Sequence, residues 1–574
     1  MRCRWPLLGA LVAIVAAPCS LRAEPSLETE PLVRALRDEL ARTRTMQLPG
    51  VPPPYYVAYT VHDVRALQVA GEFGGLVRQA QERSRGLVVS LRVGSPQLDN
   101  ARRAGSASEV SGQTPLPLDD DYQALRRRIW LATDAAYKQA VEAFEIQRAA
   151  AAQAPRDADH PADFVLPTGQ RLATASDEPT TPAAGRAEAL VRRLSALCWD
   201  FPAVDEAAIA LRVGTTTRTL VSSTGALIRD VQSLVEVAAR ASTRPSDGEA
   251  LEARWQVAAP TLDALPPAAA MAAAWRDTLH ALVLRRTAPR GEDYSGPVLF
   301  EGRAAAQLVR VLLAAHLSGT TPLQGLPDPL RADTAFEGKL GRQVVANNLD
   351  LVDDPTLTRY ADQPLVGSYA ADDEGTPPRR VQLVRRGQLA GLLMALTPRR
   401  GLVGSTGHGR YAIFGPAAAR PGNLLLSAGG GLSRAQLVRR LLQEAKRAGE
   451  DYGLIVRALA LPGKLATLGE LVRSAATPRL RPLVVLKVTA DGQEIPLRGL
   501  ELAAIPLGAF KRVLAAGREA YVDNAAGPAL LADQPDPRWV ASSVAAPALL
   551  IADLDLKRQP PRPQPPPLLP RPER

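Results

Sequence analysis

The chain has 574 residues, of which 46% are hydrophobic and only 4% aromatic, so it is long enough for two or three domains with well-buried cores. Its formal net charge is +10, but three of these charges lie in residues 1–23 and three in residues 558–574, which leaves +4 for the body between them. No basic stripe is interleaved with aromatic residues, so the composition argues against nucleic-acid binding.

Residues 1–23 have the pattern of a secretory signal peptide. Arg2 and Arg4 precede an apolar run at 7–17, and Leu21-Arg22-Ala23 forms a cleavage motif. The apolar run is too short to span a bilayer, and no later stretch approaches the roughly 20 apolar residues that a spanning helix needs. We therefore expect a periplasmic or secreted protein with no integral membrane segment after signal cleavage.

The cysteines favour a soluble exported form without disulfides. Cys19 suggests lipidation as an alternative, but Pro18 before it fits poorly to a lipobox. Signal cleavage would leave Cys198 as the sole cysteine, so no internal disulfide can form. Its setting at the end of a helical segment predicts a buried, inert thiol.

Residues 24–289 predict an α+β domain, in which helices lie across antiparallel strands. Helical periodicity covers 26–47, 120–153, 186–198 and 266–286. Strand-like runs lie between them, at 55–61, 66–73, 86–93, 208–213, 217–222, 227–238 and 251–258. A stretch rich in Pro, Asp and Thr, about 154–185, lacks periodicity and is interpreted as a spacer.

Residues 290–557 predict a second, strand-rich and mostly antiparallel domain. A strand near 296–300 runs into a helix at 303–316, and further helices are expected at 433–449 and 508–516. Strands are expected at 483–488, 495–500 and 549–554. Residues 558–574 form a proline-rich tail typical of extended or unfolded chain.

Residues 368–410 hold the most informative motifs. Asp372-Asp373-Glu374-Gly375-Thr376-Pro377 is turn chemistry, with carboxylates that can bond nearby N–H groups and a glycine free to adopt positive φ. Two apolar runs, 381–384 and 389–394, flank Arg385-Arg386-Gly387-Gln388 and predict a hairpin. The glycine-rich loop 404–410 can bring its backbone close to a ligand or to another strand.

This block resembles the "DDEGT…G-x-L-x-G-x-L…STGHG" region of the TldD/PmbA family, which includes zinc metallopeptidases and a non-zinc partner branch. The stretch 351–355, Leu-Val-Asp-Asp-Pro, is similar to the family's segment before the acidic turn. The resemblance covers about residues 290–557 and the first domain only loosely. It implies a two-domain architecture and assembly as a homodimer or heterodimer with a family member.

The zinc motif of the family is not retained. Zinc members carry His-Glu-x-x-x-His on a helix, and a cysteine near the C-terminus completes the site. Aligning Leu317-Ser318-Gly319 with the family's Leu-Glu-Gly places Arg310, Val311 and Ala315 at the His, Glu and His positions. A shift by one residue brings in His316 but leaves Val311 and Leu312 at the first two positions. No cysteine follows Cys198, so the resemblance implies no zinc cofactor here.

Other sites were weighed against simpler structural roles. Ser405 and His408, with Asp372 or Asp373 nearby, could form a hydrolase constellation, but a structural loop is the favoured interpretation. The acidic residues at 353–354 and 372–374 could hold Ca²⁺ or Mg²⁺, but turn capping without metal is favoured. The glycines at 429–431 could cradle a phosphate, but a flexible N-cap at Ser433 is favoured. His62, His160 and His280 have no ligand spacing.

The sequence thus favours a non-catalytic, metallopeptidase-related protein that binds a peptide or a partner subunit. Whether it is an enzyme stays open, because a working peptidase with an unrecognised or partner-supplied site, and a structural envelope role, are the alternatives. Backbone pairing with an extended peptide is the expected binding mode. The candidate binding residues are Gly404, Ser405, Gly407, His408, Arg410, Asp372, Asp373 and Glu374.

Overall fold

The computed structural model describes residues 27–46, 50, 52–100, 114–153, 160–173, 184–320, 335–402, 404–411, 417–460, 480–526 and 540–560. The expected signal peptide and all but the start of the proline-rich tail lie outside these residues. In the described part of the chain, no helix is both long and apolar enough to cross a membrane.

A seven-stranded sheet occupies the N-terminal half, in the order β5-β2-β1-β7-β8-β6, with β9 also paired to β8. All neighbours are antiparallel except β6 and β8, which run parallel. The strands are β1 (Tyr56–Glu72), β2 (Gly75–Arg92), β5 (Thr114–Pro115), β6 (Arg171–Ala173), β7 (Glu206–Ser222), β8 (Leu227–Thr243) and β9 (Leu251–Ala259), with a separate small pair, β3 (Gly94–Ser95) and β4 (Leu98–Asp99).

Two pairs of predicted strands are in fact single long strands. β1 spans the predicted runs 55–61 and 66–73 except for residues 55 and 73, and β7 includes both 208–213 and 217–222. The polar break in β1 contains Asp63, whose carboxylate accepts hydrogen bonds from Arg83 and Arg85 on β2. These cross-strand charge pairs compensate for the missing apolar residues, but their partners are too distant in sequence for a local pattern to reveal them.

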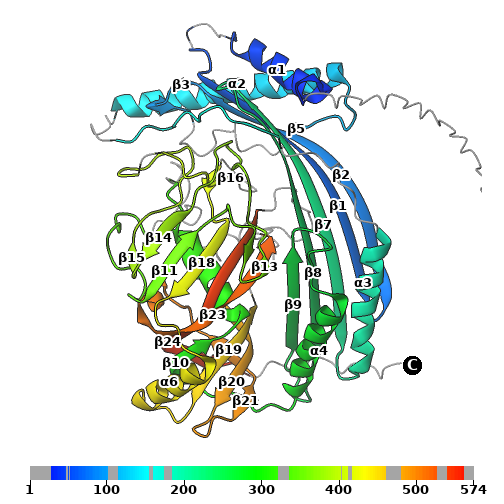
Figure 1. Ribbon diagram of the computed structural model, residues 1–574, viewed down its shortest axis with the longest axis vertical. Coiled ribbons are helices and arrows are strands. Elements are labelled where there is room, and N and C mark those ends of the chain that lie inside the picture. Colours follow the sequence, from blue (N-terminus) through cyan, green and yellow to red (C-terminus); the bar gives the residue numbers. More distant parts are fainter. Residues whose placement is uncertain are drawn as a thin grey trace, which may run out of the picture.

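Four helices cover one face of this sheet. α1 (Pro31–Thr43) and α2 (Tyr122–Gln153) lie over one end of the strands, and α3 (Ala184–Ala196) and α4 (Ala268–Leu284) over the other (Figure 1). Because strand side chains alternate between faces, odd-numbered residues of β1 pack under both helix pairs. Val57 and Tyr59 join the first core and Leu67 and Val69 the second.

The opposite, concave face of the long strands looks toward the C-terminal half (Figure 1). Even-numbered residues point this way: Tyr56 and Ala58 pack with Leu396, and Leu220 and Ile228 with Ala371. The strands at these contacts are therefore covered on both faces, by the helices and by the C-terminal half of the chain, whereas residues 75–84 of β2 are mostly exposed.

The C-terminal half contains an eleven-stranded sheet with the order β15-β14-β11-β18-β24-β10-β19-β20-β21, and with β22 and β23 also paired to β24. Most neighbours are antiparallel, but β10 with β19 and β18 with β24 run parallel. Its strands are β10 (Tyr294–Phe300), β11 (Leu349–Asp353), β14 (Val381–Arg385), β15 (Gln388–Leu389), β18 (Asn423–Ala428), β19 (Gly453–Ala460), β20 (Arg481–Val488), β21 (Glu494–Leu497), β22 (Leu500–Leu502), β23 (Val513–Ala526) and β24 (Ala541–Arg558).

Shorter elements complete this half. α6 (Arg434–Arg447) begins at Ser433, whose hydroxyl accepts a hydrogen bond from the Gln436 amide in a capping box, as expected of an N-cap. Two small strand pairs lie outside the large sheet: β12 (Arg359–Tyr360) with β13 (Gln363–Pro364), and β16 (Gly409–Arg410) with β17 (Ala418–Ala419).

Two expected helices differ from the structure. The segment 303–316 begins as α5 (Arg303–Leu308), continues as a π-turn at Val309–Leu313, and ends as a 3₁₀ turn at Ala314–His316. The segment 508–516 is a 3₁₀ turn, Leu507–Arg512, followed at once by β23. Its alanines favour a helix locally, but residues 513–516 pair with the central strand β24, and this tertiary pairing overrides propensity.

The fold is α+β, with a helix-covered N-terminal sheet and a strand-rich, largely antiparallel C-terminal sheet, as the sequence predicted.

Candidate functional site

The candidate residues of 372–374 and 404–410 come together where the C-terminal half meets the concave face of the N-terminal sheet. The acidic turn lies close to β7 and β8. A Cβ added at Gly375 would lie within 3.5 Å of the Ile228 side chain of β8 and the Leu220 side chain of β7. The glycine-rich loop packs beside it, with the Gly409 carbonyl accepting a hydrogen bond from the Asp373 amide. Asp372 and residues 406–410 are buried, whereas Asp373, Glu374, Gly404 and Ser405 are partly exposed.

Asp372 organises the turn. One of its carboxylate oxygens accepts hydrogen bonds from the Glu374 and Thr376 amides, at 3.1 and 2.7 Å, and the other from the Gly409 amide at 2.8 Å. Burial raises the pKa of this carboxyl to about 6, although the backbone N–H groups oppose the shift. The turn-capping role predicted for these acids is therefore present at Asp372.

Asp373 instead takes part in an ion-pair network between the two sheets. Its carboxylate lies 2.9 Å from Arg218 of β7 and 3.4 Å from Arg410. Burial would raise the pKa of Asp373, but these two guanidinium groups hold it below its usual value. Arg218 also binds Asp230 of β8 and donates to the carbonyls of Ala371 and Asp372, so one buried arginine connects both halves of the chain.

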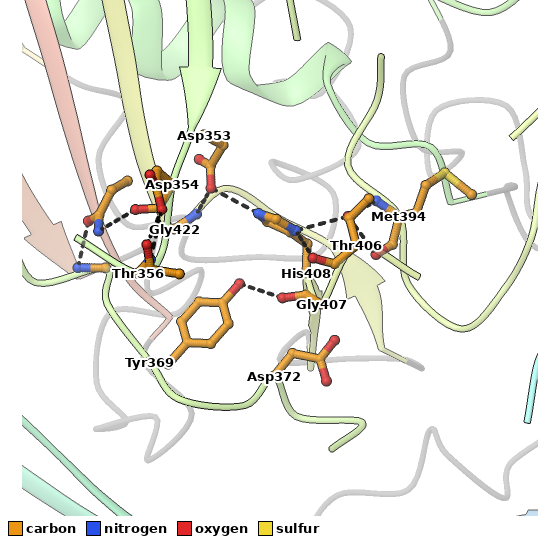
Figure 2. A network of polar contacts seen from close by, with 12 residues as sticks. Asp353, Asp354, Thr356, Tyr369, Asp372, Met394, Thr406, Gly407, His408 and Gly422 are labelled. Atoms are coloured by element: carbon orange, nitrogen blue, oxygen red, sulfur yellow. Dashed lines mark hydrogen bonds and ion pairs between the residues drawn. The ribbon is translucent and has the colours of Figure 1, made fainter. Parts of the chain in front are cut away.

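His408 is fully buried and held from both ring nitrogens (Figure 2). Its Nε2 lies 3.0 Å from Asp353 Oδ1, and its Nδ1 lies 2.9 Å from both the hydroxyl and the carbonyl oxygen of Thr406. Asp353 Oδ1 also accepts the Gly422 amide, and Tyr369 donates to the Gly407 carbonyl. This network joins the end of β11 to the glycine-rich loop.

The serine-hydrolase arrangement considered from the sequence, Ser405 with His408 and an acid of the turn, is not present in the structure. The Ser405 hydroxyl donates to the Met394 carbonyl and accepts the Gly407 amide. His408 is paired with Asp353, not with Asp372 or Asp373. The hydroxyl beside His408 is that of Thr406, which is itself bonded to the Met394 backbone. The observed bonds give this group a structural role.

The glycines of the loop have contrasting surroundings. At Gly407, where φ is +71°, an added Cβ would lie 2.2 Å from the Pro377 carbonyl oxygen. At Gly404, where φ is +83°, an added Cβ would meet no atom within 4 Å among the described residues. Close backbone approach at Gly407 is thus made to the chain itself, and the accessible part of the loop is Gly404–Ser405.

The segment matching the family's zinc helix holds a guanidinium group. Arg310 lies in the π-turn and donates to the Asp523 carboxylate at 2.9 Å, the Ser542 hydroxyl at 2.6 Å and the Asp523 carbonyl at 2.6 Å. Asp523 is 4% exposed and also lies 3.4 Å from Arg303. Arg310 therefore ties the helical segment to β23 and β24.

A zinc ion does not fit this residue set. Arg310, Val311 and Ala315 offer no metal-ligating atom, and the remaining imidazole, His316, packs against the Phe336 ring. Across the described parts of the chain, no three His, Cys, Asp or Glu side chains are grouped as metal ligands. Cys198 is a free, buried thiol, as predicted, and burial raises its pKa to about 11.

Sequence reasoning missed Arg218 and Asp523. It named Asp353 as a turn-capping or cation-binding acid but not as the partner of His408. Arg218 and Asp523 lie in ordinary strands, and only the pairing of distant segments reveals their partners.

Comparison with known proteins extends these observations. Residues 293–469 match the family model described as the PmbA/TldA metallopeptidase C-terminal domain. A metalloprotease of Methanothermobacter thermautotrophicus is 33% identical over 102 residues, which are 17% of this chain and 21% of that protein. The match thus spans about a fifth of that relative's length.

Solved structures resemble nearly the whole chain. TldE from Thermococcus kodakarensis has a TM-score of 0.60 at 13% identity, covering 91% of this chain and 100% of that one. A proposed modulator of DNA gyrase from Thermotoga maritima has a TM-score of 0.61 at 14% identity, covering 91% and 99%. The matched domain and the motif order agree: residues 293–469 carry the metallopeptidase C-terminal domain of the TldD/PmbA family, and nearly the whole chain shares the fold of these solved structures.

Proposed function

We propose that this protein is an exported, non-catalytic member of its family that binds an extended peptide or a partner subunit without cleaving it. The observation that carries the proposal is Arg310. At the position matching the first zinc-binding histidine, a cationic side chain is bonded to Asp523 and Ser542. A metal cation there would be repelled by the guanidinium group and would lack ligands.

Without zinc catalysis, the function that the fold can still perform is binding. A strand-rich domain can take up an extended segment at a sheet edge, where backbone hydrogen bonds supply affinity. The candidate contact region is the glycine-rich loop, in which Gly404 and Ser405 are accessible while His408, Arg410 and the acidic turn hold the loop in place. Dimerisation with a like or related subunit would place such a segment on a partner chain.

Metal analysis and a peptidase assay test the loss of catalysis. The chain beginning at Glu24 is purified without chelators, its zinc content is measured, and casein hydrolysis is followed with and without EDTA. We expect less than stoichiometric zinc and no EDTA-sensitive hydrolysis. One tightly held zinc per chain, lost together with an activity on chelation, would favour the alternative of a working peptidase.

A matched pair of glycine variants tests the binding region. Asparagine tolerates positive φ, so Gly404→Asn adds a side chain at the accessible part of the loop with little strain. Gly492→Asn makes the same change at φ +85°, also in open space, in the distant turn between β20 and β21. With a labelled casein digest or a copy of the chain as the probe, Gly404→Asn should weaken binding at least threefold and Gly492→Asn should not. Equal binding by both variants would leave the loop without this role.

Export is tested separately by N-terminal sequencing of protein made in a native-type host. The proposal expects a periplasmic or secreted chain that begins near Glu24. An intact Met1 in a cytosolic fraction, or a lipid on Cys19, would contradict it.

A further inference from the structure

A second cluster of charged residues lies at the other junction of the two halves, away from the acidic turn. It surrounds a cavity of about 60 Å³ between the end of α4, the segment leading into β9, and strands β20 to β22. The volume corresponds to roughly two water molecules. Four guanidinium groups line it, those of Arg285, Arg290, Arg481 and Arg498.

Three carboxylates also line the cavity, and each is already paired. Asp247 and Glu249 form ion pairs with Arg498 and Arg290, with Glu249 at 2.7 and 2.8 Å from the two groups. Glu252 pairs with Arg481 at 2.6 Å and also with Arg254, outside the cavity lining. One positive charge among the lining groups therefore has no carboxylate to balance it.

That charge belongs to Arg285, which is only 5% exposed. Its terminal nitrogens donate to two backbone carbonyls, Leu483 of β20 and Glu252 of β9, so it spans the two sheets. Its Nε has no hydrogen-bond partner among the described residues, and no carboxylate of this set lies within 4 Å of it. Burying an ion without a counter-charge is costly, and a buried donor without an acceptor adds to the cost.

The electrostatics agree with this geometry. Burial and, to a smaller extent, the nearby Arg481 lower the pKa of Arg285 to about 10, although Glu249 and Glu252 oppose the shift. An anion in the cavity would supply both the missing charge and the missing acceptor. A cation would face surplus positive charge, and water would supply the acceptor alone.

We propose that this cavity is a binding site for a small inorganic anion of about the size of chloride, held by Arg285. The bound anion would neutralise the one unpaired guanidinium group and would join β9 and α4 of the N-terminal half to β20 of the C-terminal half. Its effect would be to make the stability of the junction depend on anion concentration, independently of any peptide or partner binding.

Chloride itself is the probe. Line broadening of the chloride NMR signal is measured on the purified chain, and thermal unfolding is followed as chloride replaces gluconate, which is too bulky for the cavity, at constant ionic strength. We expect saturable broadening and a rise in Tm of about 1 °C near tenfold excess over Kd. Absence of saturable broadening in the parent overturns the proposal.

Variants locate the site. Arg285→Met should reduce the saturable broadening at least fivefold and abolish the chloride-dependent rise in Tm. Arg276→Met is the matched control, because Arg276 lies on α4, which Arg285 follows directly, but is 48% exposed at the side chain. If Arg285→Met does not fold, Arg481→Met, which removes a half-exposed charge from the cavity rim, should weaken chloride binding severalfold. Parent-like binding by every variant that folds would show that chloride binds elsewhere.

Discussion

Gly407 and Gly404 have similar positive φ angles, +71° and +83°, but different neighbours, so variants at the two positions distinguish the cost of positive φ from the cost of a steric clash. Valine at either position must adopt positive φ, which costs roughly 1–2 kcal/mol. At position 407 its Cβ would also overlap the Pro377 carbonyl. We expect Gly407→Val to lower the free energy of unfolding by at least about 2 kcal/mol more than Gly404→Val. Urea unfolding of both variants measures the difference, and equal losses would show that the loop can move away from Pro377.

Asp372 gives a pH-dependent prediction at the same scale. Its pKa is about 6 in the folded chain, above the usual 3.8, so protonation favours folding. This contribution is fully present below about pH 4 and is lost as the pH rises through 6. We expect the stability of the parent relative to Asp372→Asn to increase by about 1 kcal/mol between pH 7 and pH 5. Parallel pH profiles of the two proteins would contradict the raised pKa.

At the scale of elements, the helical segment at 303–316 is anchored by Arg310. Removing one partner of a largely buried ion pair leaves the other charge uncompensated. Arg310→Met should therefore lower the free energy of unfolding by about 2–4 kcal/mol, and Arg310→Lys should recover only part, because an ammonium cannot reproduce the forked contacts. Arg447→Met, on the exposed side of α6, is the control and should cost about 0.5 kcal/mol or less. An Arg310→Met variant as stable as this control would show that the anchor is dispensable.

The same element shows how far the sequence could be followed. Local sequence patterns predicted the structure correctly where neighbouring residues determine the conformation. Arg386-Gly387 takes positive φ at both positions, as a two-residue hairpin turn between β14 and β15 requires. Local patterns failed where pairing with a distant strand determines the conformation. Examples are the continuous β1 and residues 513–516, which were predicted as helix but pair with β24. The ligand loss at 310–315 was visible in the sequence, but the replacement of a metal contact by a bond to Asp523 was not.

At the scale of the whole molecule, the two sheets are joined by less apolar packing than each contains. The large cores lie within one half or the other, whereas the clusters that cross the junction are small, such as Leu220, Ala226, Ile228 and Ala371. Buried arginines supplement them: Arg218 at the acidic turn and Arg285 at the opposite junction. Whether the two halves unfold together in one transition should therefore depend on these polar contacts.

Arg218 allows that dependence to be tested. Its guanidinium group is 3% exposed and binds Asp230 within the N-terminal half as well as Asp373 and two carbonyls of the C-terminal half. Replacement by methionine keeps an apolar stem but leaves Asp230 without its arginine partner and Asp373 with Arg410 alone, in a buried setting, which typically costs about 3–5 kcal/mol. Calorimetry should show one unfolding transition for the parent and two separated transitions for Arg218→Met, since each half keeps its own core. Arg193→Met, on the outer helix α3, should keep the single transition. A single transition at the parent's temperature in Arg218→Met would mean that the small apolar clusters alone hold the two sheets together.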